Sequence, residues 1–377
     1  MAPLTGVAFL ARIPTTAAAI TLTLHVVLTL DQGYGAAGLV GAASTVGMAI
    51  GAPLLGRLID RRGLRTMLAV ATVAEAVFWT VAPTLSYPAL LVGALLGGML
   101  GLPVFSVVRQ SLAAMVPAPR RRTAFALDAM SVELSYIIGP ALGTTLALTL
   151  STRGAMWIIG SGWVLSGLAL WRLNPPTRSE GGLATPAAPI RTWLDLRMVG
   201  VLLATAAATF MLFGTELSMI AALQTGGHSG TIPAVNAAWC LASLAGGFAY
   251  GAARRPAPLF GLVALLGAAT LLVALGGPWW SYLILLVPTG MLCAPSLAAS
   301  AEAVSALAPE QSRGLATGLH GSSITMGAAA STPLAGLLVD IGSPSIAVLV
   351  VGAAGIVVAG IAAGMSRLSS SAVSQPV

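Results

Sequence analysis

Residues 51–75 read GAPLLGRLIDRRGLRTMLAVATVAE, and this stretch contains the pattern from which the fold can be inferred. Its charged residues lie in a short loop between Arg57 and Arg65, and long apolar runs flank the loop on both sides. A bilayer core requires about 20 apolar residues of helix. Lipid offers the backbone no hydrogen-bonding partners, so each run must be helical. The stretch therefore predicts two membrane-spanning helices joined by a basic loop.

The same alternation of apolar runs and short polar connections continues along all 377 residues. The predicted spans are 8–30, 34–55, 65–84, 87–115, 123–149, 154–172, 197–223, 231–252, 257–276, 279–306, 314–339 and 345–366. Only 8% of the residues are charged, against about 25% in a soluble domain, so lipid is the expected solvent. We predict an all-α polytopic membrane protein with twelve transmembrane helices in two pseudo-symmetric six-helix bundles.

Arginine is the only strongly basic residue type in the chain, and it marks alternate connections. The arginines on one side are Arg57, Arg61, Arg62, Arg65, Arg120, Arg121, Arg122, Arg172, Arg178, Arg191, Arg197, Arg254, Arg255, Arg313 and Arg367. Basic loops face the cytoplasm, so both termini are predicted to be cytoplasmic, in the inner (plasma) membrane. The net charge of +7 comes from these loops, and we expect no nucleic-acid binding because no basic domain is present.

The two halves of the chain align without gaps when one is shifted by 193 residues. Pro140 then meets Pro333, and Arg120 meets Arg313. We therefore divide the chain into an N-terminal bundle (1–172), a cytoplasmic linker (173–196), a C-terminal bundle (197–366) and a disordered tail (367–377). Parallel six-helix repeats with a central substrate site are typical of one large group of secondary transporters.

Residues 56–65 resemble the signature loop G-x-L-x-D-R-x-G-R-[KR] of the major facilitator superfamily, with Leu64 where an Arg is usual. Residues 139–143, Gly-Pro-Ala-Leu-Gly, resemble the G-P-x-x-G element of its proton-coupled exporters. The likeness is greatest to actinobacterial efflux-type members. It implies transport by alternating access, with spans one, two, four, five, seven, eight, ten and eleven lining the cavity.

The loop chemistry has a physical reading of its own. Gly56 and Gly63 allow close helix approach and a tight reversal. Asp60 can accept hydrogen bonds from an adjacent helix N-terminus, or pair with an arginine such as Arg61 or Arg65, and so hold the cytoplasmic side closed. The alternative is that Asp60 only fixes the loop geometry and that the arginines only set the topology.

Span five contains Gly139, Pro140 and Gly143. Proline removes an intrahelical hydrogen bond and bends the helix, and glycine lets a neighbouring helix approach. We expect either a bent helix that lines the closure interface or an ordinary packing kink.

Ionisable residues inside membrane spans are costly and are functional candidates by default. Arg109 and Asp128 lie at similar predicted depths in neighbouring spans and are a candidate ion pair. Glu133, near the midplane, is the first choice for a proton-carrying group, and Glu216 and Glu302 are weaker candidates. Under the repeat, Glu302 is equivalent to Arg109, and the two could face each other. Structural ion pairing without titration is the alternative for the whole set.

Other candidates are weaker. Arg12 and Asp31 are expected at opposite interfaces of span one, and Glu75 is expected to be structural because span three is peripheral in the superfamily. His320 more often hydrogen-bonds a neighbour than relays protons. Cys240 and Cys293 lack metal-ligand spacing and are expected to pack as small hydrophobes. The expectation for His320 also holds for His25 in span one. Tyr136, Trp163 and Trp239 could contact an aromatic or amphiphilic substrate, and Asn236 and Gln110 are among the few amides in the predicted cavity. No metal and no cofactor are expected.

The leading hypothesis is a monomeric, proton-coupled exporter of a small amphiphilic organic molecule. An uptake symporter for a sugar or similar solute is the alternative, although polar side chains at mid-depth are few. A membrane enzyme is not expected, because no interfacial His/Asp or paired-carboxylate site stands out. ATP-driven pumping is not expected either, because no nucleotide-binding Gly-rich loop with its Lys is present.

Overall fold

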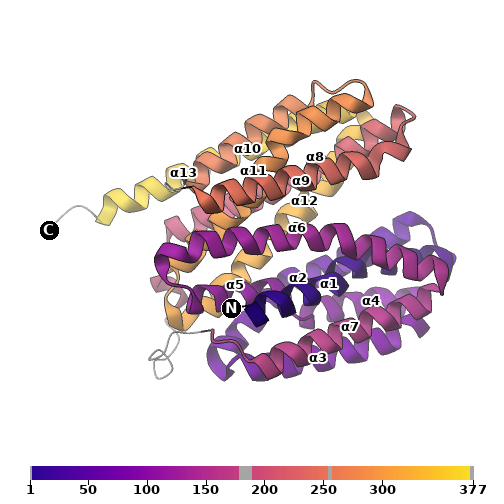
Figure 1. Cartoon of the computed structure of the whole chain (residues 1–377), viewed down its shortest axis with the longest axis horizontal. Coiled ribbons are helices and arrows are strands. Elements are labelled where there is room, and N and C mark those ends of the chain that lie inside the picture. Colours follow the sequence, from indigo (N-terminus) through magenta and orange to yellow (C-terminus); the bar gives the residue numbers. More distant parts are fainter. Residues whose placement is uncertain (1, 178–188, 254–256, 374–377) are drawn as a thin grey trace. The chain divides into compact units, whose positions relative to one another are not determined.

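The computed structural model describes residues 2–177, 189–253 and 257–373. These residues are almost entirely helical, and no β-strand occurs among them (Figure 1). The helices are α1 (Ala2–Leu28), α2 (Tyr34–Arg62), α3 (Leu64–Val81), α4 (Tyr87–Leu100), α5 (Val104–Met115), α6 (Ala118–Thr149), α7 (Thr152–Leu173), α8 (Leu196–Thr225), α9 (Ile232–Ala252), α10 (Leu259–Val273), α11 (Trp279–Leu307), α12 (Arg313–Ile341) and α13 (Pro344–Val373).

These helices confirm the predicted all-α polytopic fold. Within the described residues, eleven segments are long and apolar enough to cross a membrane, and α10 is a shorter apolar helix. The fourth predicted span is one such segment, Tyr87–Met115, but it consists of two helices, α4 and α5, separated by residues 101–103. The helix α13 continues to Val373 and so covers the first part of the predicted tail.

The chain divides into two compact units. Unit 1 comprises Met1–Met115, Leu134–Ala187 and Glu310–Ser322, and unit 2 comprises Val116–Glu133, Ala188–Pro309 and Ser323–Val377. The helices α6 and α12 therefore each contribute one part to unit 1 and another to unit 2. The predicted division at a linker of residues 173–196 stays a prediction, since residues 178–188 lie outside the described residues, as do Arg254 and Arg255.

Within unit 1, α2 packs on α4, and α7 packs on both α1 and α3. The pair α3 and α7 can be followed side by side in Figure 1. The approach of α2 to α4 is very close at Gly51, where an added Cβ would lie 1.9 Å from the carbonyl oxygen of Met99. Small residues at such points let helices pack at backbone contact, which drives association in lipid.

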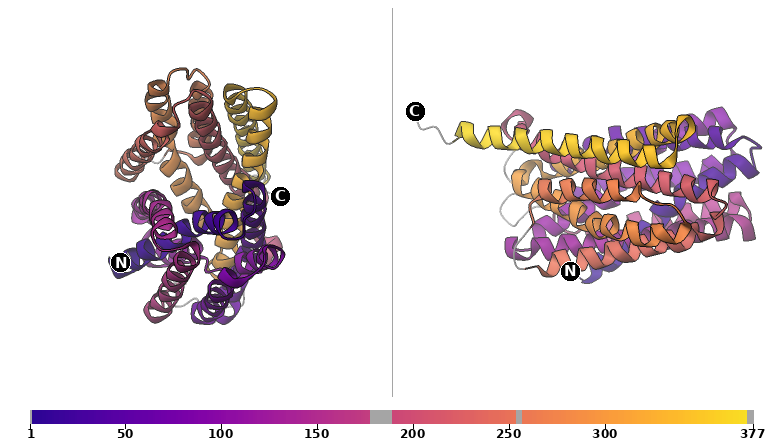
Figure 2. Two further views of the ribbon diagram at one scale, coloured as in Figure 1. Left: turned by 90° about the vertical axis from the view of Figure 1, so that its right-hand side faces the viewer. Right: turned by 90° about the horizontal axis from the view of Figure 1, so that it is seen from above.

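In unit 2, small residues also let helices pack at backbone contact. Its helix α9 lies against α11, and α13 lies against α8 and α10 (Figure 2). An added Cβ at Gly246 of α9 would lie 1.9 Å from the carbonyl oxygen of Met291 in α11. Backbone contact between helices across a glycine therefore occurs in both units.

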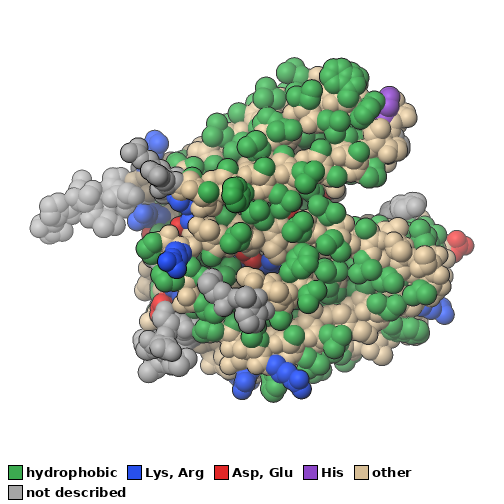
Figure 3. Space-filling model, in the orientation of Figure 1, with side chains coloured by type: hydrophobic (Ala, Val, Ile, Leu, Met, Phe, Trp, Pro, Cys, Tyr) green, Lys and Arg blue, Asp and Glu red, His purple; other side chains and the backbone are tan. Residues whose placement is uncertain are grey.

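Large apolar side chains are exposed on both units. Leu148 and Leu165 of unit 1 are 66% and 65% exposed, and Phe248 and Leu275 of unit 2 are 67% and 74% exposed. Hydrophobic side chains cover much of the face drawn in Figure 3. Monomeric soluble proteins rarely expose contiguous apolar surface of this extent, whereas a lipid-facing surface requires it. The surface thus agrees with a multi-pass membrane protein.

Candidate functional site

The signature loop of unit 1 contains a carboxylate bound to a helix N-terminus. Asp60, near the end of α2, accepts a hydrogen bond from the Gly314 amide at 2.9 Å and another from the Leu315 amide at 2.8 Å. These amides belong to the first turn of α12, where backbone N–H groups have no partner within the helix. The positive end of the helix dipole also favours a negative charge there. Asp60 thus holds the beginning of α12 with both carboxylate oxygens.

The contact requires glycine on both helices. An added Cβ at Gly56 would lie 2.3 Å from the Gly314 carbonyl oxygen, and one at Gly314 would lie 2.5 Å from that of Gly56. Gly63, which follows α2, has φ 84°, a backbone conformation that residues other than glycine rarely adopt. Among the loop arginines, Arg61 is exposed and Arg65 lies over the Trp171 ring, 5.2 Å from its centroid. The predicted glycines therefore have clear geometric roles.

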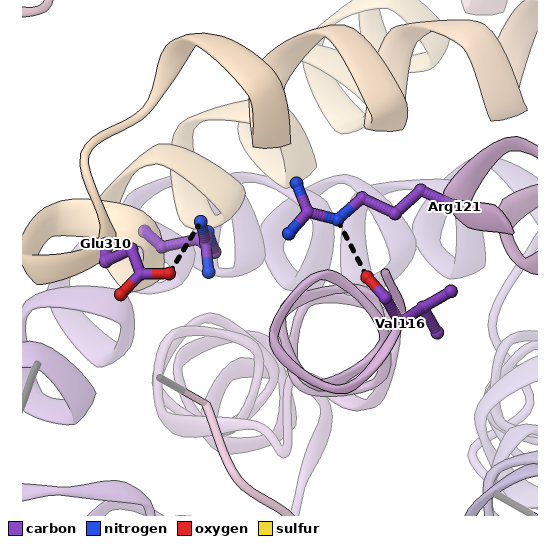
Figure 4. A network of polar contacts seen from close by, with 4 residues as sticks. Val116, Arg121 and Glu310 are labelled. Atoms are coloured by element: carbon purple, nitrogen blue, oxygen red, sulfur yellow. Dashed lines mark hydrogen bonds and ion pairs between the residues drawn. The ribbon is translucent and has the colours of Figure 1, made fainter. Parts of the chain in front are cut away.

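Two further arginine contacts lie at the beginnings of α12 and α6. In unit 1, Arg313 forms an ion pair with Glu310 at 3.7 Å (Figure 4). In unit 2, the Arg121 Nε donates to the carbonyl oxygen of Val116 at 3.0 Å (Figure 4). Each contact holds the first turn of its helix to the connection that precedes it.

Arg109, the predicted cation of span four, lies on α5 in unit 1 and is 6% exposed. Its Nη1 lies 3.4 Å from the Nδ1 of His320, on the part of α12 that belongs to unit 1. The sequence reasoning considered His320 but did not find this contact, because α5 and α12 are far apart in the chain. Asp128 lies on α6 in unit 2 and is buried, so its pairing with Arg109 stays a prediction.

The glycines of span five lie against α1 within unit 1. An added Cβ at Gly139 would lie 1.9 Å from the Thr16 Oγ1, and one at Gly143 would lie 2.7 Å from the Thr21 Oγ1. Thr16 also donates to the Ser135 carbonyl oxygen at 2.7 Å. Pro140 lies inside the continuous helix α6. The structure therefore shows close packing, and the role of this segment in closure stays a prediction.

Unit 2 contains Glu133, the first choice for a proton-carrying group, and Glu216, one of the weaker candidates. The Cys293 thiol of α11 donates to the Glu133 Oε1 at 3.1 Å. Ser243 of α9 also hydrogen-bonds Glu133 and accepts from the Ala294 amide at 3.3 Å. Glu216 of α8 lies near enough to interact electrostatically with Glu133. Cys293 is thus more than a packing residue, which sequence reasoning missed because nothing in the spacing links it to Glu133.

Glu302 lies on α11 of unit 2 and is partly buried. Its electrostatic neighbours within the unit are Arg121 and Arg122, and Arg122 lies over the Tyr250 ring, 5.9 Å from its centroid. The expected facing of Glu302 and Arg109 involves different units and stays a prediction.

Arg12 is buried within unit 1, and its expected place at a membrane interface stays a prediction. It is 1% exposed, and its guanidinium lies over the Phe105 ring of α5, 5.3 Å from the centroid. Its position on the α1 face that meets α5 buries it, which linear position alone does not reveal. Asp31 is exposed in the turn after α1. Among the described residues, no group of three or more His, Cys, Asp or Glu side chains could hold a metal ion.

Comparison with known proteins adds a family and a fold. Residues 4–256 match the Major Facilitator Superfamily. A comparison with curated proteins by sequence found no match. The structure is similar to that of the human organic anion transporter MFSD10 (TETRAN), at TM-score 0.75 and 17% identity, covering 96% of this chain and 99% of that chain.

Two bacterial structures are similar to the same degree. A bacterial homologue of the iron transporter ferroportin in its outward-facing state has TM-score 0.76 and 13% identity, covering 98% of this chain and 99% of that one. A variant of the E. coli fucose:proton symporter FucP has TM-score 0.73 and 18% identity, covering 97% of both chains. At such identities the likeness shows the fold alone.

Proposed function

Because the chain belongs to the Major Facilitator Superfamily, we propose that this multi-pass membrane transporter exports a small amphiphilic organic compound in exchange for protons. We place it in the inner (plasma) membrane as a monomer, with both termini cytoplasmic, because basic loops stay on that side. The proposal requires one carboxyl that gains and loses a proton and one contact that opens and closes. The chain offers a candidate for each.

Glu133 is the proposed proton carrier, and its contact with Cys293 is the observation that carries the proposal. A carboxyl inside a span is costly unless it is neutralised or well solvated. A thiol is only a weak hydrogen-bond donor, and Glu216 adds a second negative group nearby. A proton or a substrate group can therefore replace this arrangement at little cost. Alternating access would then couple proton release to substrate binding, since each conformation offers the carboxyl different surroundings.

Asp60 is the proposed latch. Its two hydrogen bonds hold the first turn of α12, and α12 continues from unit 1 into unit 2. Restraint at the beginning of this helix would therefore oppose any movement that α12 must make during the cycle. We propose that Asp60 keeps the cytoplasmic side closed and that its release permits the inward-open state.

Uptake of a sugar-like solute is the second candidate, and one observation favours it. Gln110 of α5 is fully buried, and neither atom of its amide has a hydrogen-bond partner in the described part of the chain. A buried amide without partners costs free energy, and a hydroxylated substrate could satisfy it. A sugar site needs several polar side chains at mid-depth, and this chain has few, so export of a less polar compound remains the leading proposal.

The test is a substrate screen on purified protein in proteoliposomes, with and without an imposed pH gradient. We expect accumulation of at least one amphiphilic compound to follow the gradient in the wild type and in the control Asp31→Asn, whose carboxylate is exposed. Glu133→Gln should lose the gradient response while it still exchanges substrate across the membrane. Wild-type flux that ignores the gradient, or a Glu133→Gln variant that still follows it, would contradict the proposal.

A further inference from the structure

The break in the fourth span is closed by a side chain from another helix. The helix α4 ends at Leu100 and α5 begins at Val104. Pro103 has no amide hydrogen to donate, and the Gly101 amide makes only a long 3.4 Å bond to Gly98. The Leu102 amide donates instead to the Glu75 Oε1 at 3.1 Å. Glu75 therefore fastens the beginning of α5 to α3.

Glu75 is a buried carboxyl held only by neutral donors. It lies in the second half of α3, is 5% exposed, and its Oε2 accepts from the Trp79 Nε1 at 2.8 Å. With the Leu102 amide, each oxygen thus accepts one hydrogen bond. Among the described residues, no cation balances the charge of this group. An uncompensated carboxylate inside a membrane span is costly, so the bond to α5 and the charge of Glu75 must depend on each other.

Two helix ends of opposite polarity meet at this carboxyl. An added Cβ at Gly101 would lie 3.1 Å from the Glu75 Oε1 and 3.0 Å from the Gly97 carbonyl oxygen, at the end of α4. The Leu102 amide, two residues before α5, favours the carboxylate, whereas the carbonyl end of α4 disfavours it. A protonated Glu75 can donate to a free carbonyl of α4, which the ionised group cannot do. The break therefore offers each protonation state a different partner.

Other titratable side chains on α3 and on the helices packed against it lie toward helix ends or on α5. These are Arg65 on α3, Arg57, Asp60, Arg61 and Arg62 on α2, Tyr87 on α4, Arg109 on α5, and Arg153 and Arg172 on α7. None of them is among the contacts of the Glu75 carboxyl. Glu75 is thus the group at the break that can change charge.

The second half of the chain supports this reading by lacking both partners. The shift of 193 residues places Ala268 opposite Glu75 and Pro295 opposite Leu102. Neither the carboxyl nor the amide is present there, and α11 runs unbroken from Trp279 to Leu307. The break and the carboxyl that closes it therefore occur together in one half and are both absent from the other.

We propose that Glu75 is a proton-binding site that fastens α5 when ionised and releases it when protonated. The helix α5 carries Arg109 to its contact with His320, so Glu75 acts as a positioning residue for Arg109. The ligand is a proton, and the site is separate from Glu133, on a different helix and in the other unit. The inference therefore holds whether or not Glu133 carries the coupling proton.

The test measures hydrogen exchange of the peptide that covers residues 99–107, at about pH 5 and about pH 8, in the full-length protein. The peptide that covers 262–270 in the unbroken α10 contains no titratable side chain and corrects for the intrinsic effect of pH. After correction, we expect exchange near Leu102 to be about tenfold faster at the lower pH, since protonation weakens the Leu102 hydrogen bond by removing the charge of its acceptor. Glu75→Gln, which cannot ionise, should abolish this pH dependence. Asp31→Asn should retain it.

Three outcomes would overturn the proposal, and a fourth separates it from the proposed function. In the wild type, the exchange rate near Leu102 relative to the reference peptide should depend on pH. If it does not, the proposal is overturned without any variant. A Glu75→Gln protein that elutes as a folded monomer and still shows the pH dependence overturns it as well. If Glu75→Gln does not fold, Trp79→Phe removes one donor and keeps the carboxyl, and an unaltered pH profile in that variant overturns it. Glu133→Gln should retain the α5 response even if gradient-driven transport is lost, which separates this inference from the proposed function.

Discussion

The carboxylates of unit 1 and those of unit 2 are held in different ways. In unit 1, Asp60 accepts two backbone amides in the first turn of α12, and Glu75 accepts the backbone amide of Leu102, two residues before α5. In unit 2, Glu133 is held by the side chains of Cys293 and Ser243. Amides at a helix N-terminus are fixed in direction and carry the helix dipole, whereas a thiol is weak and can rotate away.

The difference suggests that the carboxylates of the two units have different roles. A carboxylate bonded to backbone amides restrains a whole helix, so a change in that bond moves secondary structure. A carboxyl bonded to small side chains can exchange a proton while the backbone stays in place. We therefore expect substitutions in unit 1 to alter conformational equilibria, and substitutions around Glu133 to alter coupling alone. Three experiments test this contrast between the units, beyond those already given for Glu133 and Glu75.

The largest effect is expected for Asp60→Ala. It removes two hydrogen bonds to a charged group, each contributing about 1.5–3 kcal/mol. We expect exchange of the first turn of α12 to rise about tenfold or more, and the initial rate of transport to fall accordingly. The matched control is Asp340→Ala, which removes an exposed carboxylate from the same helix. If Asp60→Ala leaves both exchange and transport unchanged, unit 1 does not use its carboxylates to restrain helices.

An intermediate effect is expected for Gly51→Ala in unit 1 and Gly246→Ala in unit 2. Each added methyl would lie 1.9 Å from a carbonyl oxygen of the facing helix, and overpacking of this kind costs about 1–3 kcal/mol. Both variants should lower the midpoint of thermal unfolding by several degrees and to a similar extent. Gly360→Ala, which meets nothing within 4 Å, should change it little. Unequal losses would show that the two units do not share the same packing.

The smallest effect is expected at Cys293. Serine keeps a donor for Glu133, so Cys293→Ser should stay within about twofold of wild-type gradient-driven flux. Alanine removes a neutral donor that contributes about 1 kcal/mol, and Cys293→Ala should reduce that flux by about two- to fivefold. The unfolding midpoint should change little in either variant. A large loss of stability in Cys293→Ser would show that unit 2 anchors its backbone through this contact after all.

Much of the fold could be predicted from sequence because lipid leaves few alternatives. Each apolar run had to be a helix, and all of the predicted spans have helical counterparts. The break in the fourth span was not predicted, although Gly101 and Pro103 mark it. Residues 87–115 are apolar apart from Arg109, Gln110 and two serines, and hydropathy does not register a missing hydrogen bond. The carboxyl that makes the break tolerable comes from another helix.

The sequence could predict individual residues of the candidate site, but not the contacts between them. Asp60 and its glycines were found because they are neighbours in the chain, but their partner, the first turn of α12, is more than 250 residues away. The burial of Arg12 could not be predicted either, because position along a helix does not reveal which face is buried. The contacts of Arg109 with His320, and of Glu133 with Cys293, likewise join distant segments.

The order of residues alone was enough to identify this chain as a bundle of membrane-spanning helices with a basic signature loop. Hydrophobicity and the need to satisfy backbone hydrogen bonds act locally, so they can be read from a linear sequence. The folded arrangement was needed to learn which carboxylate meets which donor. Those pairings depend on the rotation and depth of each helix against its neighbours, which are set by packing over the whole unit. Glu75 on α3 and the Leu102 amide, in the break before α5, became one site only when the helices came together.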